Sequence, residues 1–241
     1  MIPIRQFNRH NMQPDYKKNY NEVLFAQVAP AYDRITRVLS FGRDQAWKAK
    51  LIQLLPAKDY QHCLDLACGT GDITFALAQK FQQAMVYGID VSTQMLSLAH
   101  KKNDAARVHF SCQDMCQLMF DDESMDLVTG GYALRNAPSF EIALNECYRV
   151  LKPGGIAAFL DFSKPSSRVL QKGNYALLKM WGMLWGQVFH NNAAVYGYIA
   201  ESLMQFPTRL QVHGACKRRG FTVLKTKRLF AGMLEIIVCQ K

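Results

Sequence analysis

The clearest chemical signal in this sequence is a pair of glycines followed by an acidic residue. Gly69 and Gly71 come directly after a short apolar run, an apolar helical pattern follows them at once, and Asp90 ends the next apolar run. Glycines let the backbone approach a ligand closely, and the start of a helix presents free N–H groups. An acid about 20 residues after the first glycine accepts hydrogen bonds from ribose hydroxyls. The pattern therefore predicts a nucleotide-binding site.

The residues around the glycines indicate which nucleotide binds. A dinucleotide site needs a third glycine three residues after the second, and this chain has Thr74 there. Asp65 and Asp72 flank the glycines; they would repel a pyrophosphate and suit a cationic ligand with an α-amino group. Asp-x-x-x-Gly-x-Gly with an acid ending the next strand resembles motif one of the S-adenosylmethionine (SAM) methyltransferases. The alternative is a glycine turn that binds no ligand, and Asp90 argues against it.

Further polar residues follow the third and fourth apolar runs. Asp114 comes just after the third run, and Arg135 and Asn136 follow the glycines that end the fourth. In an open parallel sheet, ligands bind beyond the carboxyl ends of the strands. Asp114 can then accept a hydrogen bond from an adenine amino group; the alternative is a loop aspartate in water. Arg135 cannot be a base, because its pKa stays above about 12, but it can stabilise an oxyanion. Its alternative is an ordinary surface ion pair.

The elements that position these residues alternate between strand and helix patterns, which is typical of a parallel sheet. Strands are expected near 62–67, 84–90, 107–111, 125–131 and 156–163, and over 221–227 and 233–239, the last of them antiparallel. The expected fold class is α/β, a doubly wound, mostly parallel seven-stranded sheet of Rossmann-like type. N-terminal helices precede the sheet, and a helical insertion precedes its last two strands.

The domain organisation follows from the same patterns. Residues 1–19 are polar and without periodicity, so we expect a mobile N-terminal segment. Residues 20–241 are expected to form a single domain that begins with two or three helices and carries the insertion at about 166–206. Ser139 is the predicted N-cap of a helix that ends at Leu151.

The apolar segment 175–189 lies within this insertion and is hydrophobic nearly all round. It is too short to span a bilayer. An ordinary core helix is one interpretation. A lid over an apolar substrate, or a surface that touches a membrane, is the other.

Composition limits the class of protein. The chain has 241 residues, 49% of them hydrophobic, which is enough for one large α/β core. Its net charge of +10 suits nucleic acid, anionic lipid or acidic ligands, but the basic cluster at 217–228 lacks stacking aromatics, so no nucleic acid is expected. Seven cysteines without a C-x-x-C pair indicate reduced thiols and no metal site. The polar start lacks a signal-peptide pattern, so a cytoplasmic location is expected.

Six stretches together resemble the ubiquinone/menaquinone biosynthesis C-methyltransferase family. They are Phe25–Asp33 with Ser40–Gly42 and Trp47, Leu64–Asp72, Asp90–Leu96, Tyr132–Asn136, Arg149–Gly155 with Asp161–Pro165, and Tyr198–Pro207. The resemblance implies a class I methyltransferase that transfers methyl from SAM, without a metal, to a ring carbon of a polyprenylated hydroquinone. It implies donor contacts from Asp65, Gly69, Thr70, Gly71, Asp90, Val91, Met95, Asp114, Met115 and Gly131. Tyr32, Arg135 and Asn136 would face the ring as the catalytic residues.

Four positions depart from the family pattern. Thr36 stands where Asn is usual, Asp44 where a basic residue or His is usual, Asp161 in place of Glu, and Gly131 in place of Ser. We expect the donor site to bind SAM despite these changes. The residues of the quinol pocket are defined less well by the resemblance, because of these changes.

The expected chemistry depends mainly on alignment. A ring carbon must attack the sulfonium methyl in line, and positioning contributes up to about 7–11 kcal/mol. Loss of a hydroquinone hydroxyl proton makes the ring carbon more nucleophilic. Arg135 and Asn136 would hold the phenolate, and Tyr32 or a water would pass the proton. The sequence does not identify the group that accepts the ring proton.

Other functions stay open on the sequence alone. One is SAM-dependent methylation of a different small molecule or of RNA. Another is a non-catalytic subunit that binds SAM or a prenyl lipid within a quinone-biosynthesis complex. The partners expected are a prenylated quinol, a membrane surface at which the protein is peripheral, and such a complex or a second copy of the chain. Benzoquinol and naphthoquinol are equally compatible with the sequence, as is any tail length.

Overall fold

A computed structural model describes residues 14–241, and these residues contain a seven-stranded sheet in the order β3-β2-β1-β4-β5-β7-β6. The strands are β1 (His62–Leu66), β2 (Met85–Asp90), β3 (Val108–Cys112), β4 (Met125–Gly131), β5 (Leu151–Phe162), β6 (Thr222–Leu229) and β7 (Leu234–Gln240). Strands β1 to β5 are parallel, and β7 runs antiparallel to both β5 and β6. The doubly wound α/β fold predicted from the sequence is confirmed.

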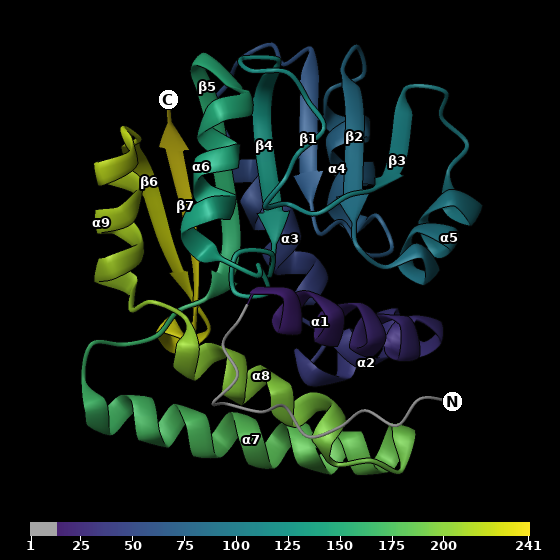
Figure 1. The fold of residues 1–241 in the computed structure, drawn as a ribbon, viewed down its shortest axis with the longest axis vertical. Helices are drawn as coiled ribbons and strands as arrows, with labels where there is room; N and C mark the ends of the chain where they lie inside the picture. The colour runs from purple at the N-terminus through teal and green to yellow at the C-terminus, as the bar shows by residue number, and fades with distance from the viewer. Residues whose placement is uncertain (1–13) are drawn as a thin grey trace.

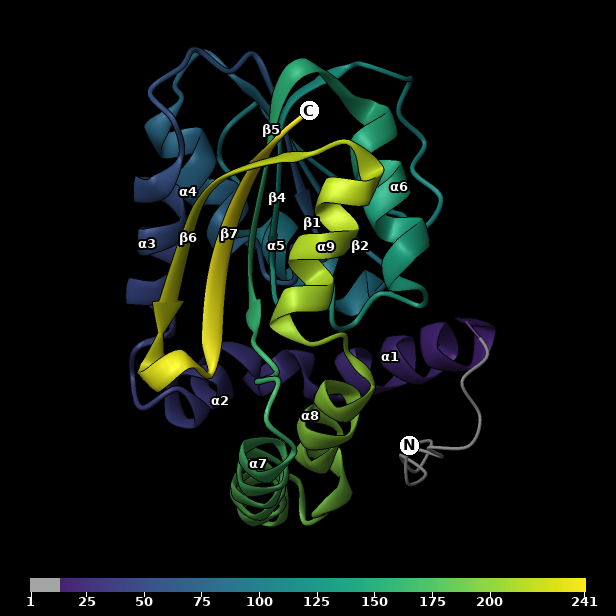
Figure 2. The same ribbon diagram turned by 90° about the vertical axis from the view of Figure 1, so that its left-hand side faces the viewer.

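Helices cover both faces of the sheet (Figure 2). One face carries α3 (Asp44–Leu54) and α4 (Asp72–Lys80), and the opposite face carries α6 (Phe140–Val150) and α9 (Arg209–Arg219). A further helix, α5 (Thr93–Lys102), packs on β2 and β3 at one edge. Because both faces are covered, the sequences of the central strands are nearly continuous apolar runs.

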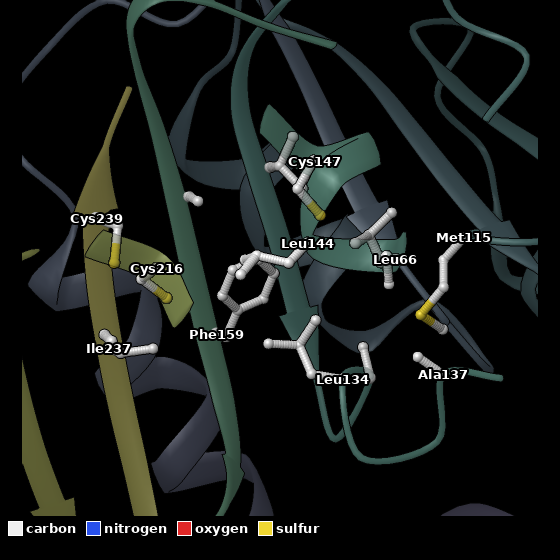
Figure 3. Packing of buried hydrophobic residues seen from close by; sticks show 14 of the residues in the cluster. Leu66, Met115, Leu134, Ala137, Leu144, Cys147, Phe159, Cys216, Ile237 and Cys239 are labelled. Atoms are coloured by element: carbon white, nitrogen blue, oxygen red, sulfur yellow. The ribbon is translucent and has the colours of Figure 1, made fainter. Parts of the chain in front are cut away.

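Each face of the sheet has its own apolar core. Cys63 of β1 points into the cluster under α3 and α4, whereas its neighbours Leu64 and Leu66 point into the cluster under α6 and α9. Figure 3 shows this second cluster, with Phe159 of β5 packed against Leu144 of α6. All five side chains are at most 2% exposed. Burying each of the leucines or the phenylalanine stabilises the fold by about 1.5–3 kcal/mol.

A separate layer of helices lies beyond the carboxyl ends of the parallel strands. It contains α1 (Pro14–Val28), the short η1 (Ala29–Ala31), α2 (Tyr32–Leu39), α7 (Arg168–His190) and α8 (Ala194–Gln205). The arrowheads of β1, β2 and β4 point toward it in Figure 1. A third apolar cluster holds the layer together, including Leu24, Val28, Ile35, Val195 and Tyr198. This layer covers the edge of the sheet at which ligands bind in open α/β folds.

The beginning and end of α6 illustrate how local sequence sets the boundaries. Ser139 caps the helix, since its hydroxyl accepts the Ile142 N–H at 3.4 Å, as predicted. The next strand starts immediately, at Leu151, instead of near residue 156. Leu151 pairs with Met125, and the register then shifts so that Ile156 pairs with Leu127. The strand therefore begins earlier than predicted, with an irregularity over residues 152–155.

The N-terminal helix begins earlier than the sequence predicted. Residues 14–19 belong to α1, although they fell within the segment expected to be mobile, and residues 1–13 of that segment lie outside the described residues. Tertiary contacts explain the difference. The Lys17 ammonium donates to the Arg135 carbonyl oxygen at 2.9 Å, and the Lys18 ammonium lies 3.0 Å from the Asp114 carboxylate. No local pattern in the sequence reports either contact.

The insertion consists of α7 and α8, which pack closely against each other. Gly182 and Gly186 are the two buried residues of α7. A Cβ atom on Gly182 would overlap the Tyr196 carbonyl group of α8, and one on Gly186 would lie 2.6 Å from the Asn192 carbonyl oxygen. All of the apolar side chains of α7 are exposed or half-buried, so the interpretation as an ordinary core helix is wrong. None of the helices within residues 14–241 has the length and apolarity needed to cross a membrane.

Candidate active site

The glycine loop lies between β1 and α4, where backbone geometry explains its composition. Gly69 and Gly71 have φ angles of +57° and +91°, in the left-handed region that glycine adopts without strain. A Cβ atom on Gly71 would lie 2.6 Å from the Phe75 ring. Asp90, at the end of β2, fixes this loop: its carboxylate accepts the Gly69 N–H at 2.9 Å and the Ser92 N–H at 2.8 Å.

A pocket of about 650 Å³, which we call the loop pocket, opens beside these glycines. It is lined by nine of the predicted site residues: Tyr32, Gly69, Asp90, Val91, Met95, Asp114, Met115, Gly131 and Asn136. They come from α2, from the ends of β1, β2 and β4, from the start of α5 and from the loop after β3. The carboxyl edge of the sheet thus brings together residues spread over about half of the chain, as the strand pattern predicted.

Three predicted donor-site residues do not line the loop pocket. Asp65 is 1% exposed and accepts hydrogen bonds from the Thr74 hydroxyl at 2.7 Å and the Thr129 hydroxyl at 3.0 Å. Burial raises the pKa of Asp65 to about 7, against the opposing effect of these two hydrogen bonds. The Thr70 hydroxyl donates to Asp33 at 2.7 Å. Asp65, Thr70 and Gly71 therefore support the conformation of the glycine loop without lining the pocket.

Two residues of α1 that the sequence pattern did not single out also line the loop pocket. Lys18 pairs with the Asp114 carboxylate, whose second oxygen accepts the Cys116 N–H at 2.8 Å. The hydrogen bond that Lys18 donates to the Asp114 carboxylate raises the pKa of Lys18. Asn21 is the second, and its amide donates to the Asn136 carbonyl oxygen at 2.6 Å. Neither residue lies in a motif, so only the docking of α1 reveals them.

A second and larger pocket lies beneath the helical layer. It has a volume of about 1070 Å³, and we call it the apolar pocket. Most of its lining is aliphatic or aromatic and comes from α1, α2, α7 and α8, including Leu24, Phe25, Val28, Ile35, Leu39, Leu178, Trp181, Val195 and Ile199. Phe25, Tyr32, Tyr132 and Asn136 line both pockets. The two pockets therefore meet at these four residues.

Arg135 lines the apolar pocket, and neighbouring side chains hold its guanidinium in place. It is 5% exposed, and its guanidinium donates to the Ser202 hydroxyl, lies 3.6 Å from the Asp161 carboxylate and sits 5.1 Å from the Phe162 ring centre. The Arg135 backbone N–H also donates to Asp161, at 2.9 Å. Burial raises the pKa of Asp161, while the Arg135 charge opposes that shift. The alternative of a solvated surface ion pair is wrong.

Asn136 and Tyr32 stand where the pockets join. The Asn136 side-chain amide donates to the Tyr132 carbonyl oxygen at 2.9 Å, and its own oxygen is buried without a hydrogen-bond partner within residues 14–241. An unpaired buried acceptor is costly unless a ligand satisfies it. Burial raises the pKa of Tyr32 to about 12. Tyr32 therefore keeps its proton at neutral pH and can donate a hydrogen bond, but it is not a base.

Comparison with known proteins agrees with this arrangement. The model of the ubiE/COQ5 methyltransferase family matches residues 13–241. The chain belongs to this family. It is therefore a methyltransferase, and the resemblance stated from its motifs is confirmed.

Named relatives are similar along nearly their whole length. The 2-phytyl-1,4-naphtoquinone methyltransferase of Thermosynechococcus vestitus is 34% identical over 222 residues, which cover 91% of this chain and 98% of that protein. The demethylmenaquinone methyltransferase of Staphylococcus carnosus is 31% identical over 212 residues, covering 87% and 88%.

Solved structures of lower sequence identity show the same fold. A SAM-dependent methyltransferase of Thermotoga maritima superposes with a TM-score of 0.64 at 18% identity and covers 91% of this chain and 98% of its own. Phosphoethanolamine N-methyltransferase 2 of Haemonchus contortus, in complex with SAM, has a TM-score of 0.65 at 18% identity, covering 90% and 57%. At this identity the likeness concerns the fold alone.

Proposed function

We propose that this family member transfers a methyl group from SAM to a ring carbon of a prenylated naphthohydroquinone. The observation that carries the proposal is the meeting of two chemically different pockets at Tyr32, Tyr132 and Asn136. One pocket offers carboxylates at strand ends to a nucleoside, and the other offers a large apolar surface to a prenylated ring. Relatives named for naphthoquinone and demethylmenaquinone methylation support the naphthohydroquinone in preference to a benzohydroquinone.

The residues of the loop pocket fit SAM. Asp90 uses one lone pair of each carboxylate oxygen on backbone N–H groups, which leaves the others for the ribose hydroxyls. In the proposal Asp114 accepts the adenine amino group, Val91, Met95 and Met115 pack on the base, and Gly69 and Gly131 let the backbone approach the donor. Asp65, Thr70 and Gly71 support the loop without touching SAM.

SAM supplies an electrophilic methyl group, and this chain supplies alignment and charge stabilisation. Tyr132 and Asn136 line both pockets, so in the proposal they set the approach of the ring carbon to the methyl group. Arg135 is held by Ser202 and Asp161, which keeps its guanidinium ready for a phenolate oxygen. The unpaired Asn136 oxygen is suited to accept a hydrogen bond from a ring hydroxyl.

We also propose that α7 contacts a membrane from the cytoplasmic side, so that a prenylated substrate reaches the apolar pocket. The face of α7 away from the pocket carries Val169, Leu170, Leu177, Met180, Met183, Leu184 and Val188, each between 42% and 78% exposed. Leu178 and Trp181, on the other face, line the pocket. Arg168 and Lys172 fall on the stripe beside the exposed apolar one, a pattern suited to anionic lipid. In this proposal residues 20–241 act as one peripheral domain.

Methyl transfer to defined substrates tests the proposed function. Purified protein is incubated with SAM carrying a deuterated methyl group and with either a prenylated 1,4-naphthohydroquinone or a prenylated benzohydroquinone, both kept reduced. We expect a labelled methyl group on the naphthohydroquinone ring, detected by mass spectrometry. Absence of product from both substrates, with SAM binding intact by calorimetry, would contradict the proposal and favour a non-catalytic binding role. Product from the benzohydroquinone alone would reassign the ring class.

A further inference from the structure

Asp44 is the only carboxylate that lines the apolar pocket among the described residues. It is the first residue of α3 and is 4% exposed. Its side chain stands at a position where the family resemblance led us to expect a basic residue or His. A buried carboxylate in an otherwise apolar pocket is costly unless its charge is compensated, and its presence therefore requires an explanation.

The contacts of Asp44 hold its carboxylate in one orientation. The Tyr132 hydroxyl donates to one oxygen at 2.9 Å, and the Lys48 ammonium lies 2.6 Å from the other. The Asp44 backbone N–H donates to the Ser40 hydroxyl at 3.1 Å. Each carboxylate oxygen accepts from one donor here and has a further lone pair, so the group can accept another proton.

The groups that face Asp44 compensate its charge. Lys48 also lies 2.8 Å from Asp72 of α4, so one ammonium is shared by two carboxylates. Burial alone would lower the pKa of Lys48, but Asp44, Tyr32 and Asp72 together raise it. The cation is therefore permanent at neutral pH. One ammonium therefore compensates the carboxylates of both Asp44 and Asp72.

The other titratable groups of the apolar pocket do not act as bases. Burial raises the pKa of Tyr32 and Tyr198 to about 12, and it also raises the pKa of Tyr132 and of Tyr196 above the usual value for tyrosine. The guanidinium of Arg135 carries hydrogen-bond donors and has no acceptor site. Among the described residues that line this pocket, Asp44 is thus the one group that can accept a proton from a substrate.

Asp44 also lines a second, polar opening. Asp33, Arg37, Gly42, Asp44, Gln45 and Asp72 surround this outer pocket of about 480 Å³. Asp33 and Gln45 are exposed there. Asp44 therefore separates the apolar pocket on one side from a polar pocket that leads to solvent on the other. A proton taken up inside has a path out that does not cross the apolar lining.

We propose that Asp44 accepts the hydroxyl proton of the bound hydroquinone and releases it to water through the outer pocket. The inference rests on the proposed function. The O–H bond breaks and its proton moves to the Asp44 carboxylate, while the oxygen electrons drive the ring carbon onto the methyl group. The C–C bond forms and the S–C bond breaks, its electron pair staying on sulfur. The ring proton then moves to the vacated oxygen, so one proton is released per methyl transferred.

The test compares Asp44→Asn with wild type, using a short-chain prenylated naphthohydroquinone kept reduced. Asparagine keeps the size and the acceptor for Tyr132 but cannot take up a proton. We expect kcat to fall about 10²–10⁴-fold, the usual contribution of general acid–base catalysis, with SAM affinity unchanged. Asp126→Asn is the matched control, because Asp126 pairs with Lys152 at 2.8 Å and lines none of the three pockets. Its kcat should stay close to that of wild type.

A second variant separates proton transfer from a structural role. In Asp44→His the base is an imidazole, which titrates at a higher pH than a carboxyl group does in model peptides. The acid limb of the kcat profile should therefore move to higher pH, with activity partly restored relative to Asp44→Asn. Near-wild-type kcat in Asp44→Asn, or the same acid limb in Asp44→His and wild type, would overturn the inference and leave the proposed function intact. Absence of turnover by wild type would overturn both.

Discussion

At the scale of single residues, the charges of the acceptor side are held in place by the protein itself. Arg135 is anchored by Asp161 and Ser202, and Asp44 by Lys48 and Tyr132. One group is a guanidinium and the other a carboxylate, and both line the same apolar pocket. Charges placed this way lose little energy to reorganisation during the reaction, which is how preorganised sites stabilise a transition state.

Arg135→Lys tests the role of the guanidinium. Lysine keeps the charge, but it loses the planar set of donors that contacts Ser202 and Asp161 and would contact a phenolate. We expect kcat to fall roughly 10²–10³-fold, as for loss of one donor at an oxyanion. SAM affinity measured by calorimetry should be nearly unchanged, since Arg135 lines the apolar pocket and not the loop pocket. Weakened SAM binding with unchanged kcat would place Arg135 at the donor instead.

At the scale of elements, α7 serves two functions on its two faces. Its inner face packs on α8 through Gly182 and Gly186 and contributes Leu178 and Trp181 to the apolar pocket. Its outer face exposes a stripe of large apolar side chains. The close α7–α8 contact therefore keeps the pocket closed on one side, while the exposed stripe is available to lipid.

Gly182→Ala should weaken the contact between α7 and α8. The added methyl group would overlap the Tyr196 backbone, so the helices must separate. We expect a loss of about 1–3 kcal/mol in the free energy of unfolding, as for overpacking elsewhere. Gly173→Ala is the matched control on the same helix, because a Cβ atom there meets nothing within 4 Å. It should be neutral or stabilising by up to about 1 kcal/mol. Equal stabilities of the two variants in denaturant titrations would contradict the packing argument.

The outer face of α7 is tested with vesicles. Met180→Glu combined with Leu184→Glu places two charges in the exposed apolar stripe, so binding to vesicles rich in anionic lipid should be largely lost in flotation assays. Met119→Glu is the control, because Met119 is 80% exposed but lies in the loop after β3. Activity on a short-chain, water-soluble substrate should persist in all variants. Equal vesicle binding by the double variant and wild type would exclude α7 as the contact.

At the scale of the whole molecule, the buried carboxylates make stability depend on pH. Burial raises the pKa of Asp65 to about 7, above its value of about 3.9 in an unfolded chain. Between these values the unfolded chain releases this proton and the folded chain keeps it. The contribution of Asp65 to stability is therefore fully present below pH 4 and is lost as the pH rises toward 7, by up to about 1.4 kcal/mol per pH unit.

Asp65→Asn should remove this part of the pH dependence. The amide stays neutral and can still form hydrogen bonds with Thr74 and Thr129. The free energy of unfolding of the variant should therefore increase relative to that of wild type as the pH rises from 5 to 7. Denaturant titrations at several pH values measure the difference. Because Asp90 and Asp161 also titrate, only the difference between variant and wild type is informative. A constant difference across this range would show that Asp65 ionises normally in the folded protein.

The sequence by itself determined the features with a local signature. The glycine loop, the acid at the end of β2 and the alternation of strands and helices appear as short patterns, because backbone conformation and strand pleating act over a few residues. Five parallel strands then bring their carboxyl ends to one edge, so the strand pattern alone was enough to place Gly69, Asp90 and Asp114 together. The family followed from these motifs together with more selective stretches such as Phe25–Asp33 and Tyr198–Pro207.

Only the tertiary structure decided what lies opposite that edge. Asp44 and Tyr132 are 88 positions apart, and their hydrogen bond depends on how α3 packs against the sheet. Lys18 reaches Asp114 across almost half of the chain, in a helix whose first residues have no apolar periodicity. Burial of apolar surface drives such docking, and it is non-directional and leaves no local pattern. For this reason the nucleotide side of the site could be predicted from the chain, whereas the apolar pocket and the Asp44 carboxylate that lines it emerged only from the packing of the helical layer.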